Sequence, residues 1–272
     1  MTIHRTDQWL DTYLDKIKTS QKQPLVEHQK LICKPLTSFF RSIDEKTLQE
    51  HLIRHGLFLP HKNNSKYLSE WLEKDFYPFF KKLYQKLKRA WDGPEADIFL
   101  FPSNENSREL QEQFKGNAGL SYPSKLFLFL SPKATPKALT ALFLHEYSHT
   151  CRLHYFEKAE EDYTLLDAII LEGTAEYLVR RLLGSSSGSQ IIQTLSEKQA
   201  KALWDKWIKK YRDIKRLDAK HDLIMYGKHG LPNHLGYNIG YYLVSNYAAK
   251  QNYSSKKILY TPNEEFLSII KG

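Results

Sequence analysis

The sequence has little cysteine and no long apolar run. Two cysteines, Cys33 and Cys151, occur among 272 residues, too few for the disulfide framework of a small secreted domain. No uncharged apolar stretch approaches the roughly 20 residues that a transmembrane helix requires, and the apolar run at 165–171 contains Asp167. The N-terminal segment lacks a cationic region followed by an apolar one, so we expect no secretory signal. These absences predict a cytoplasmic protein without a membrane span.

Glycine and proline are also sparse, at 12 and 11 residues, which excludes collagen-like and low-complexity architectures. Aromatic residues make up 13% of the chain, and this apolar content argues against intrinsic disorder. The net charge is +9, yet the densest basic run, at 206–216, still contains Asp213. Because acidic residues are interleaved with the basic ones, we expect a solvated basic surface and no nucleic-acid partner.

Apolar residues at three- and four-residue spacing predict helices over most of the chain. The expected helices span 3–19, 65–91, 135–155, 164–184, 195–217 and 236–249, with loops at 184–189 and 221–235. Pro78 is expected to kink the second of these helices. Short apolar segments bounded by proline or glycine predict strands at 97–101 and 125–130, with a turn at 116–119 between them.

Capping signals mark where several of these helices begin. Ser42 and Glu45 have the spacing of a capping box, as do Thr164 and Asp167. Thr135 precedes a proline, which predicts an N-cap followed by proline at the first helical position.

The segment 145–149 reads His-Glu-Tyr-Ser-His, which has the form HExxH. Histidines four positions apart lie on one face of a helix, so His145 and His149 can reach the same ion. Glu146 lies beside that ion, where it can take a proton from a metal-bound water. Residues 141–144 are apolar, and two unliganded histidines would be costly in such a buried helix. The motif therefore predicts a metal centre; the alternative is two satisfied histidines on an ordinary helix.

A catalytic zinc site needs a third protein ligand and keeps one position open for water. His154 is one candidate, but it follows His149 by five positions instead of the six of the metzincin pattern, and the glycine of that pattern is missing. Glu172 is the better candidate, because a helix–loop–helix hairpin can return the next predicted helix to the metal. Glu176 lies on the same face and is expected to orient a metal-bound imidazole. The alternative for this face is that it is solvated or paired with Arg180.

An HExxH motif followed by a glutamate on a second helix resembles the gluzincin zinc-peptidase pattern. Three segments, LFLHEYSHTCRLHY, LLDAIILEGTAEYLV and HLGYNIGYYLV, resemble more closely the YjaZ-type predicted zinc-dependent proteases of bacteria. The resemblance covers roughly residues 95–250. It implies Zn²⁺ as the cofactor, with His145, His149 and Glu172 as ligands and Glu146 as the general base.

A tetrahedral intermediate also needs an electrophile beyond the zinc. Gluzincins often use a tyrosine or histidine located C-terminal to the metal helices. The candidates here are His221, Tyr226, His229, His234, Tyr237 and Tyr241. Tyr237 is preferred because it lies in a family-like segment; the alternative is that it packs in the core. The segment 125–130 holds the place of the substrate-binding edge strand of such peptidases, but a buried core strand is an equal alternative.

Together, the residues and the resemblance predict an α+β, mainly helical, zincin-like fold with a small sheet beside the metal-binding helix. A helical N-terminal subdomain at 1–94 is expected to precede a zincin-like catalytic region at 95–272. The expected function is hydrolysis of peptide or protein substrates by a zinc-activated water with Glu146 as general base. The alternative is a non-catalytic helical binding protein with a structural or vestigial metal site. The intact Glu146 favours the enzyme, since a structural site needs no base.

Overall fold

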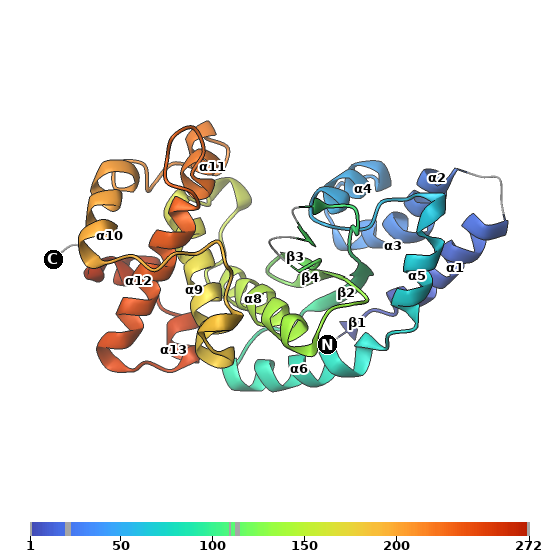
Figure 1. Ribbon diagram of the computed structural model, residues 1–272, viewed down its shortest axis with the longest axis horizontal. Coiled ribbons are helices and arrows are strands. Elements are labelled where there is room, and N and C mark those ends of the chain that lie inside the picture. Colours follow the sequence, from blue (N-terminus) through green and yellow to red (C-terminus); the bar gives the residue numbers. More distant parts are fainter. Residues whose placement is uncertain (1, 20–22, 109, 112–114, 271–272) are drawn as a thin grey trace. The chain divides into compact units, whose positions relative to one another are not determined.

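The structure is a computed structural model that describes residues 2–19, 23–108, 110–111 and 115–270. The chain divides into two compact units, Met1–Lys86 with Glu95–Phe143 and Leu87–Pro94 with Leu144–Gly272. Two long helices, α6 (Phe76–Trp91) and α8 (Pro136–Tyr155), contribute residues to both units (Figure 1). The division at residue 94 into a helical subdomain and a catalytic region stays a prediction.

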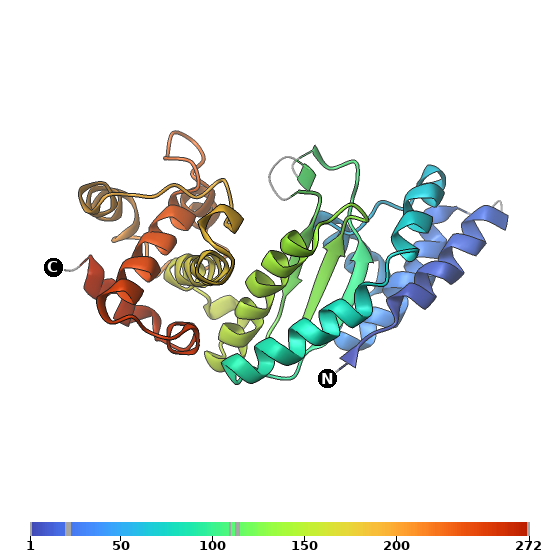
Figure 2. The ribbon, with the colours of Figure 1, turned by 60° about the horizontal axis from the view of Figure 1, so that its bottom comes forward.

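Among the described residues, four strands of the first unit form one mixed sheet in the order β1-β2-β4-β3. They are β1 (Thr2–Ile3), β2 (Asp97–Pro102), β3 (Ala118–Ser121) and β4 (Lys125–Leu130). β1, β2 and β4 are parallel, whereas β3 is antiparallel to β4. Figure 2 shows the strands flanked by α1 (Thr6–Thr19) on one side and by the N-terminal turns of α8 on the other. This cover explains why β2 and β4 are almost continuously apolar.

The strands predicted at 97–101 and 125–130 are confirmed as β2 and β4. Of the two alternatives for 125–130, the buried core strand is the one observed, because β4 lies between β2 and β3. The turn predicted at 116–119 is wrong in its second half, since Ala118 begins β3. The segment AGLS has weak intrinsic strand propensity, and it becomes a strand through its pairing with β4.

Short helices complete the first unit. They are α2 (Pro24–His28), α3 (Lys34–Leu36), α4 (Glu45–Arg54) and α5 (Ser65–Leu72). The capping box predicted at Ser42 and Glu45 is wrong, because the Asp44 carboxylate caps α4 by accepting from two backbone N–H groups at 2.8 and 2.9 Å. The single kinked helix predicted at 65–91 is two helices, α5 and α6. Pro78 lies in the first turn of α6, where its missing N–H removes no helical hydrogen bond.

The second unit is helical. Besides the C-terminal part of α8, it contains α9 (Leu165–Leu183), α10 (Glu197–Leu203), α11 (Ala219–Tyr226), α12 (Leu235–Gln251), α13 (Ser255–Leu259) and α14 (Asn263–Phe266). The α+β, mainly helical fold class is therefore confirmed, whereas the zincin-like arrangement stays a prediction. No helix in the described part of the chain combines the length and apolar character that a membrane crossing requires.

The helix starts predicted before α8 and α9 are confirmed. The Thr135 hydroxyl accepts from the backbone N–H of Ala138 at 3.2 Å. Thr164 and Asp167 form both hydrogen bonds of the capping box, and Gly184 ends α9. These signals succeed because every partner lies within one turn of the helix end.

Two predictions between α9 and α12 need correction. The helix predicted at 195–217 ends early, since α10 continues only through a π-helical turn, Trp204–Ile208. Beyond it, the carbonyl oxygens of Arg212 and Ile214 accept from the first N–H groups of α9, each at 2.9 Å. The loop predicted at 221–235 is wrong in its first part, which is helix α11. Gly227, with φ of 68°, ends that helix. A glycine in this conformation indicates where a helix ends, and it does not predict that the residues before it form a loop.

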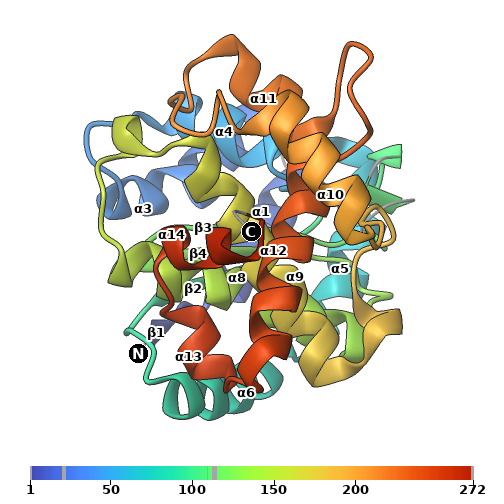
Figure 3. The same ribbon diagram turned by 90° about the vertical axis from the view of Figure 1, so that its left-hand side faces the viewer.

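Two glycines allow α9 and α12 to lie in direct backbone contact (Figure 3). A Cβ atom added at Gly173 would lie 2.2 Å from the carbonyl carbon of Gly240. A Cβ atom added at Gly240 would lie 2.1 Å from the carbonyl oxygen of Ile169. Backbone atoms cannot rotate out of the way, so both positions require glycine. Because Gly173 follows Glu172, this contact also fixes the turn of α9 that carries the predicted third ligand.

The first prediction concerns this contact. Gly240→Ala is expected to lower the free energy of unfolding by about 1–3 kcal/mol, because the added methyl group overpacks the helix crossing. Urea denaturation of the metal-free protein measures the change. Ala249→Ser adds one atom at an exposed position of the same helix and is expected to stay within about 0.5 kcal/mol of the unaltered protein. Equal stability of the two variants would show that the crossing tolerates a side chain.

Candidate metal centre

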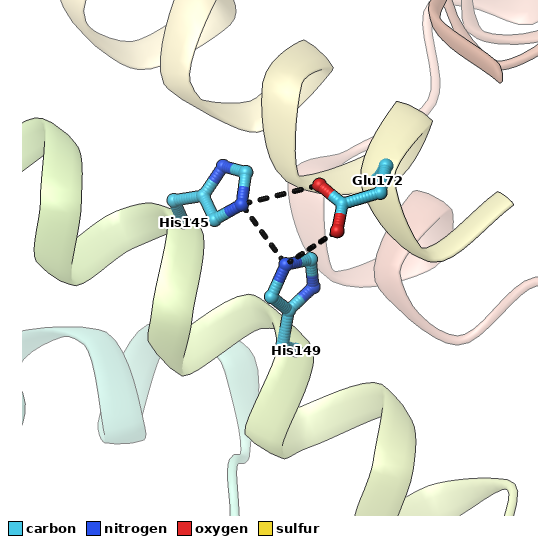
Figure 4. A group of neighbouring side chains, drawn as sticks. All are labelled: His145, His149 and Glu172. Carbon is cyan, nitrogen blue, oxygen red and sulfur yellow. Dashed lines mark hydrogen bonds and ion pairs between the residues drawn. The ribbon is translucent and has the colours of Figure 1, made fainter. Parts of the chain in front are cut away.

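Two helices of the second unit bring three potential ligands together. Consecutive turns of α8 present His145 and His149, and α9 presents Glu172. The two Nε2 atoms lie 2.9 Å apart. Oε2 of Glu172 lies 3.4 Å from Nε2 of His145, and Oε1 lies 3.6 Å from Nε2 of His149. Figure 4 shows both rings directed toward the carboxylate.

The donor set and its spacing fit a zinc ion. Tetrahedral zinc holds nitrogen and oxygen ligands at ~2.0–2.2 Å, which separates two ligand atoms by ~3.3–3.5 Å. The histidine–carboxylate separations of 3.4 and 3.6 Å match this value. The 2.9 Å between the two Nε2 atoms is a hydrogen-bond distance and would lengthen slightly around an ion. Three protein ligands leave a fourth position for water, as in catalytic zinc sites.

The three side chains are partly shielded from solvent, and His149 is the most buried of them. His149 is 9% exposed, whereas His145 is 29% and Glu172 is 21% exposed. The group is therefore sheltered but open to a small molecule. Nδ1 of His149 is buried without a hydrogen-bond partner among the described residues. Such an atom is costly, so the interactions of His149 must come mainly through Nε2, which faces Glu172.

The charge of Glu172 controls the protonation of the group. Burial lowers the pKa of His145, but the hydrogen bond and charge of Glu172 outweigh it, and the pKa rises to about 9. Burial lowers the pKa of His149 to about 3. Burial also opposes ionisation of Glu172, yet the two histidines hold its pKa below the ordinary value. Without a metal, the group is thus a carboxylate, one imidazolium and one neutral imidazole.

Glu146, the predicted base, is 7% exposed and follows His145 on α8. Its negative charge contributes to the raised pKa of His145, which places the carboxylate close enough to influence the group electrostatically. His154, the rejected ligand candidate, is exposed and lies outside the group of three ligand atoms.

Glu176, predicted to orient an imidazole, is buried and has other hydrogen-bond partners. Arg180 donates from Nε to Oε1 of Glu176. The backbone N–H of Ser189 donates to Oε1 and Oε2 at 3.0 and 3.2 Å. Glu176 thus ties the loop after α9 to its helix, and its influence on His145 is that of a nearby charge. The Arg180 pairing was the alternative for this face; it follows the i,i+4 rule for helices.

Tyr237, the preferred electrophile, lies in the first turn of α12 and is partly buried. Its ring centroid is 5.9 Å from that of Tyr226 at the end of α11. Burial and the charge of Glu172 raise the pKa of Tyr237. Burial likewise raises the pKa of Tyr226, with a further contribution from Glu172. Both phenols therefore remain protonated donors near the carboxylate, and Tyr226 is the more exposed, at 43%.

Of the other electrophile candidates, His234 lies beside Tyr237, with the ring centroids 6.2 Å apart. Nδ1 of His221 lies 3.0 Å from Asp222 Oδ1. The guanidinium of Arg180 covers the ring of Tyr241, 4.9 Å from its centroid. His229 is exposed, and His234 precedes α12 with a φ of 53°. Sequence reasoning assigned no role to Arg152, which the structure buries one turn after His149.

The site is a candidate zinc centre in which one helix supplies two histidines and a second supplies a glutamate, on a mainly helical α+β fold. Residues 76–268 match the family described as "Predicted Zn-dependent protease (DUF2268)". The uncharacterized protein YjaZ of Bacillus subtilis (strain 168) is 37% identical over 233 residues, which cover 86% of this chain and 89% of the relative. No solved structure matches the chain. The chain therefore belongs to the family of predicted Zn-dependent proteases, which confirms the resemblance to YjaZ-type proteins.

The second prediction follows from the raised pKa of His145. Zinc must displace the proton from its Nε2 atom, so zinc affinity is expected to rise about tenfold per pH unit up to about pH 9 and then level off. Competition with a chromophoric chelator at several pH values measures this slope. His154→Ala removes an exposed histidine outside the group and is expected to leave the slope unchanged. An affinity that does not change between pH 7 and pH 9 would contradict the prediction.

Proposed function

We propose that this protein is a zinc-dependent peptidase of the gluzincin-like HExxH type, with His145, His149 and Glu172 as the zinc ligands. The observation that carries the proposal is the convergence of two imidazole nitrogens and a carboxylate within 4.8 Å of one another. The family description, a predicted Zn-dependent protease, supports the same activity. Peptides or proteins are the substrates, and the two unpaired, buried cysteines suit the reducing cytoplasm.

The three ligands hold the ion, and the other residues handle protons and charge. When bound, zinc supplies Lewis acidity that polarises a carbonyl group and lowers the pKa of water. Glu146 is the general base, because it follows the first ligand directly and is shielded from bulk solvent, at 7% exposed. It accepts a proton from the attacking water and passes it to the leaving amine. His149 is already neutral and presents a lone pair on Nε2 without losing a proton.

Tyr237 supports the negative charge that develops on the substrate oxygen. Its raised pKa keeps the phenol protonated, so it can donate a hydrogen bond. Tyr226 lies beside it, with the two ring centroids 5.9 Å apart, and the charge of Glu172 raises the pKa of both phenols. Glu176 fixes the loop at Ser189 and adds negative charge near the ligands.

The third prediction tests the base. Glu146→Gln is expected to retain zinc and to lose peptide cleavage by about 100-fold or more, because an amide cannot accept the proton. Zinc content is measured by elemental analysis and cleavage with a quenched fluorescent peptide library. Glu157→Gln makes the same chemical change at an exposed position just beyond α8 and is the matched control. Zinc-loaded protein that cleaves equally well before and after Glu146→Gln would refute the role of Glu146, and zinc without any cleavage would favour a non-catalytic binding protein.

The fourth prediction tests the ligand set. Glu172→Ala is expected to lower the zinc content of the purified protein well below that of His154→Ala, because only Glu172 belongs to the group of ligand atoms. Both variants remove a polar side chain from one of the two metal-site helices. Circular dichroism of each variant shows whether it has kept its helical fold. A larger zinc loss in His154→Ala would overturn the choice of the third ligand.

A further inference from the structure

Arg152 is a buried cation that the proposed mechanism leaves unused. It lies one turn after His149 on α8 and is 4% exposed. Its Nη1 atom donates to the carbonyl oxygens of Leu259 and Thr261 at 2.8 and 3.1 Å. Its Nη2 atom donates to Oδ1 of Asn263 at 2.6 Å. One planar guanidinium thus holds three acceptors of a single segment, residues 259–263.

The same segment is hydrogen-bonded to the start of α9. Nδ2 of Asn263 donates to Oδ1 of Asp167 at 2.6 Å. Oδ2 of Asp167 accepts from the backbone N–H and the hydroxyl of Thr164, each at 2.8 Å, and so caps α9. Glu172 lies five residues further along that helix. An unbroken series of hydrogen bonds therefore runs from α8, through segment 259–263, to α9.

Close backbone contact does little to hold these two helices together. α9 packs along α12 and also contacts α13 and α14, whereas within the described residues α8 and α9 have few close backbone contacts. The ligand atoms nevertheless have to meet to within a few tenths of an ångström for zinc to bind well. With so little backbone contact between α8 and α9, side-chain interactions must help to set the separation of His149 and Glu172.

The buried guanidinium suits this task. Removing an arginine from water is costly unless its N–H groups find acceptors. The fork of arginine offers several donors in one plane with fixed spacing, so the three acceptors around Arg152 are held in a defined geometry. The rings of Phe156 and Phe266 lie 4.8 and 6.0 Å from its Cζ atom and restrict its movement further.

We propose that Arg152 and Asn263 are positioning residues that hold α8 and α9 at the separation the zinc ligands require, with Asp167 as their anchor on α9. The C-terminal segment 259–263 is then a structural part of the metal centre although it supplies no ligand. This inference rests on the proposed function, since it concerns the same zinc ligands.

The test compares two substitutions in that segment. Asn263→Ala breaks the bridge between Arg152 and Asp167. Thr261→Val removes the buried hydroxyl that donates to the Lys257 carbonyl oxygen at 2.7 Å but keeps the carbonyl oxygen that Arg152 uses. Both are expected to lower the melting temperature of the metal-free protein. Only Asn263→Ala is expected to weaken zinc binding, by about 10- to 100-fold, the usual effect of losing a group that orients metal ligands.

Arg152→Lys provides a second, more conservative variant. It keeps the charge but carries its donors on a single nitrogen, which cannot reach all three acceptors, so an intermediate loss of zinc affinity is expected. Affinity is measured with zinc alone by chelator competition. The visible absorption of the cobalt-substituted protein provides a readout of coordination geometry that a merely structural role would leave unchanged. It is expected to differ from the unaltered protein in Asn263→Ala and to be retained in Thr261→Val.

Equal zinc affinity and equal cobalt spectra in Asn263→Ala and Thr261→Val would overturn the inference while leaving the zinc site in place. An unaltered protein that binds no zinc would overturn the proposed function, and this inference with it. Selective weakening in Asn263→Ala and Arg152→Lys would establish the bridge as a positioning device.

Discussion

The structure depends on one electrostatic constraint: two imidazole rings and a carboxylate share a largely buried space. Glu172 remains ionised there because the histidines lower its pKa. In the metal-free state, the proton on His145 supplies the positive charge that balances it. A divalent ion held as proposed would balance this charge better, since it would interact with all three groups at once.

Successive turns of helix α9 make different contacts, and together they hold Glu172 in place. Asp167 caps the helix and binds Asn263. Glu172 faces the histidines, and Gly173 brings the same turn against α12. One turn later, Glu176 pairs with Arg180 and holds Ser189. The helix that carries Glu172 is thus fixed from several sides, which the proposed role of Glu172 as a zinc ligand requires because small displacements weaken metal binding.

The interactions that could be predicted best from the sequence are those between residues within one or two helical turns of each other. The pairing of His145 with His149 follows from the helical repeat, and Thr164 with Asp167 follows from a capping rule. That Glu172 lies beside the two histidines was harder to predict, because it depends on how two helices pack in a hairpin. β3 could not be predicted from AGLS, since its strand character comes from its pairing with β4. At Asp44 a local rule chose the wrong residue, because Ser42 and Asp44 offer competing caps only two residues apart, and α4 begins after Asp44.

Arg152 shows why part of the site is invisible to such rules. Its acceptors are 107 to 111 residues away along the chain, and neither carbonyl oxygens nor one asparagine form a recognisable spacing. A lone arginine in an apolar helix is nevertheless a signal, since burying its charge demands acceptors from elsewhere. The same reasoning applies to Glu176, where the nearest opposite charge, Arg180, is the partner that the structure gives it. The need to compensate each buried charge thus explains the pairing with Arg180, which was one of the alternatives for this face, and it implies distant partners for Arg152 without identifying them.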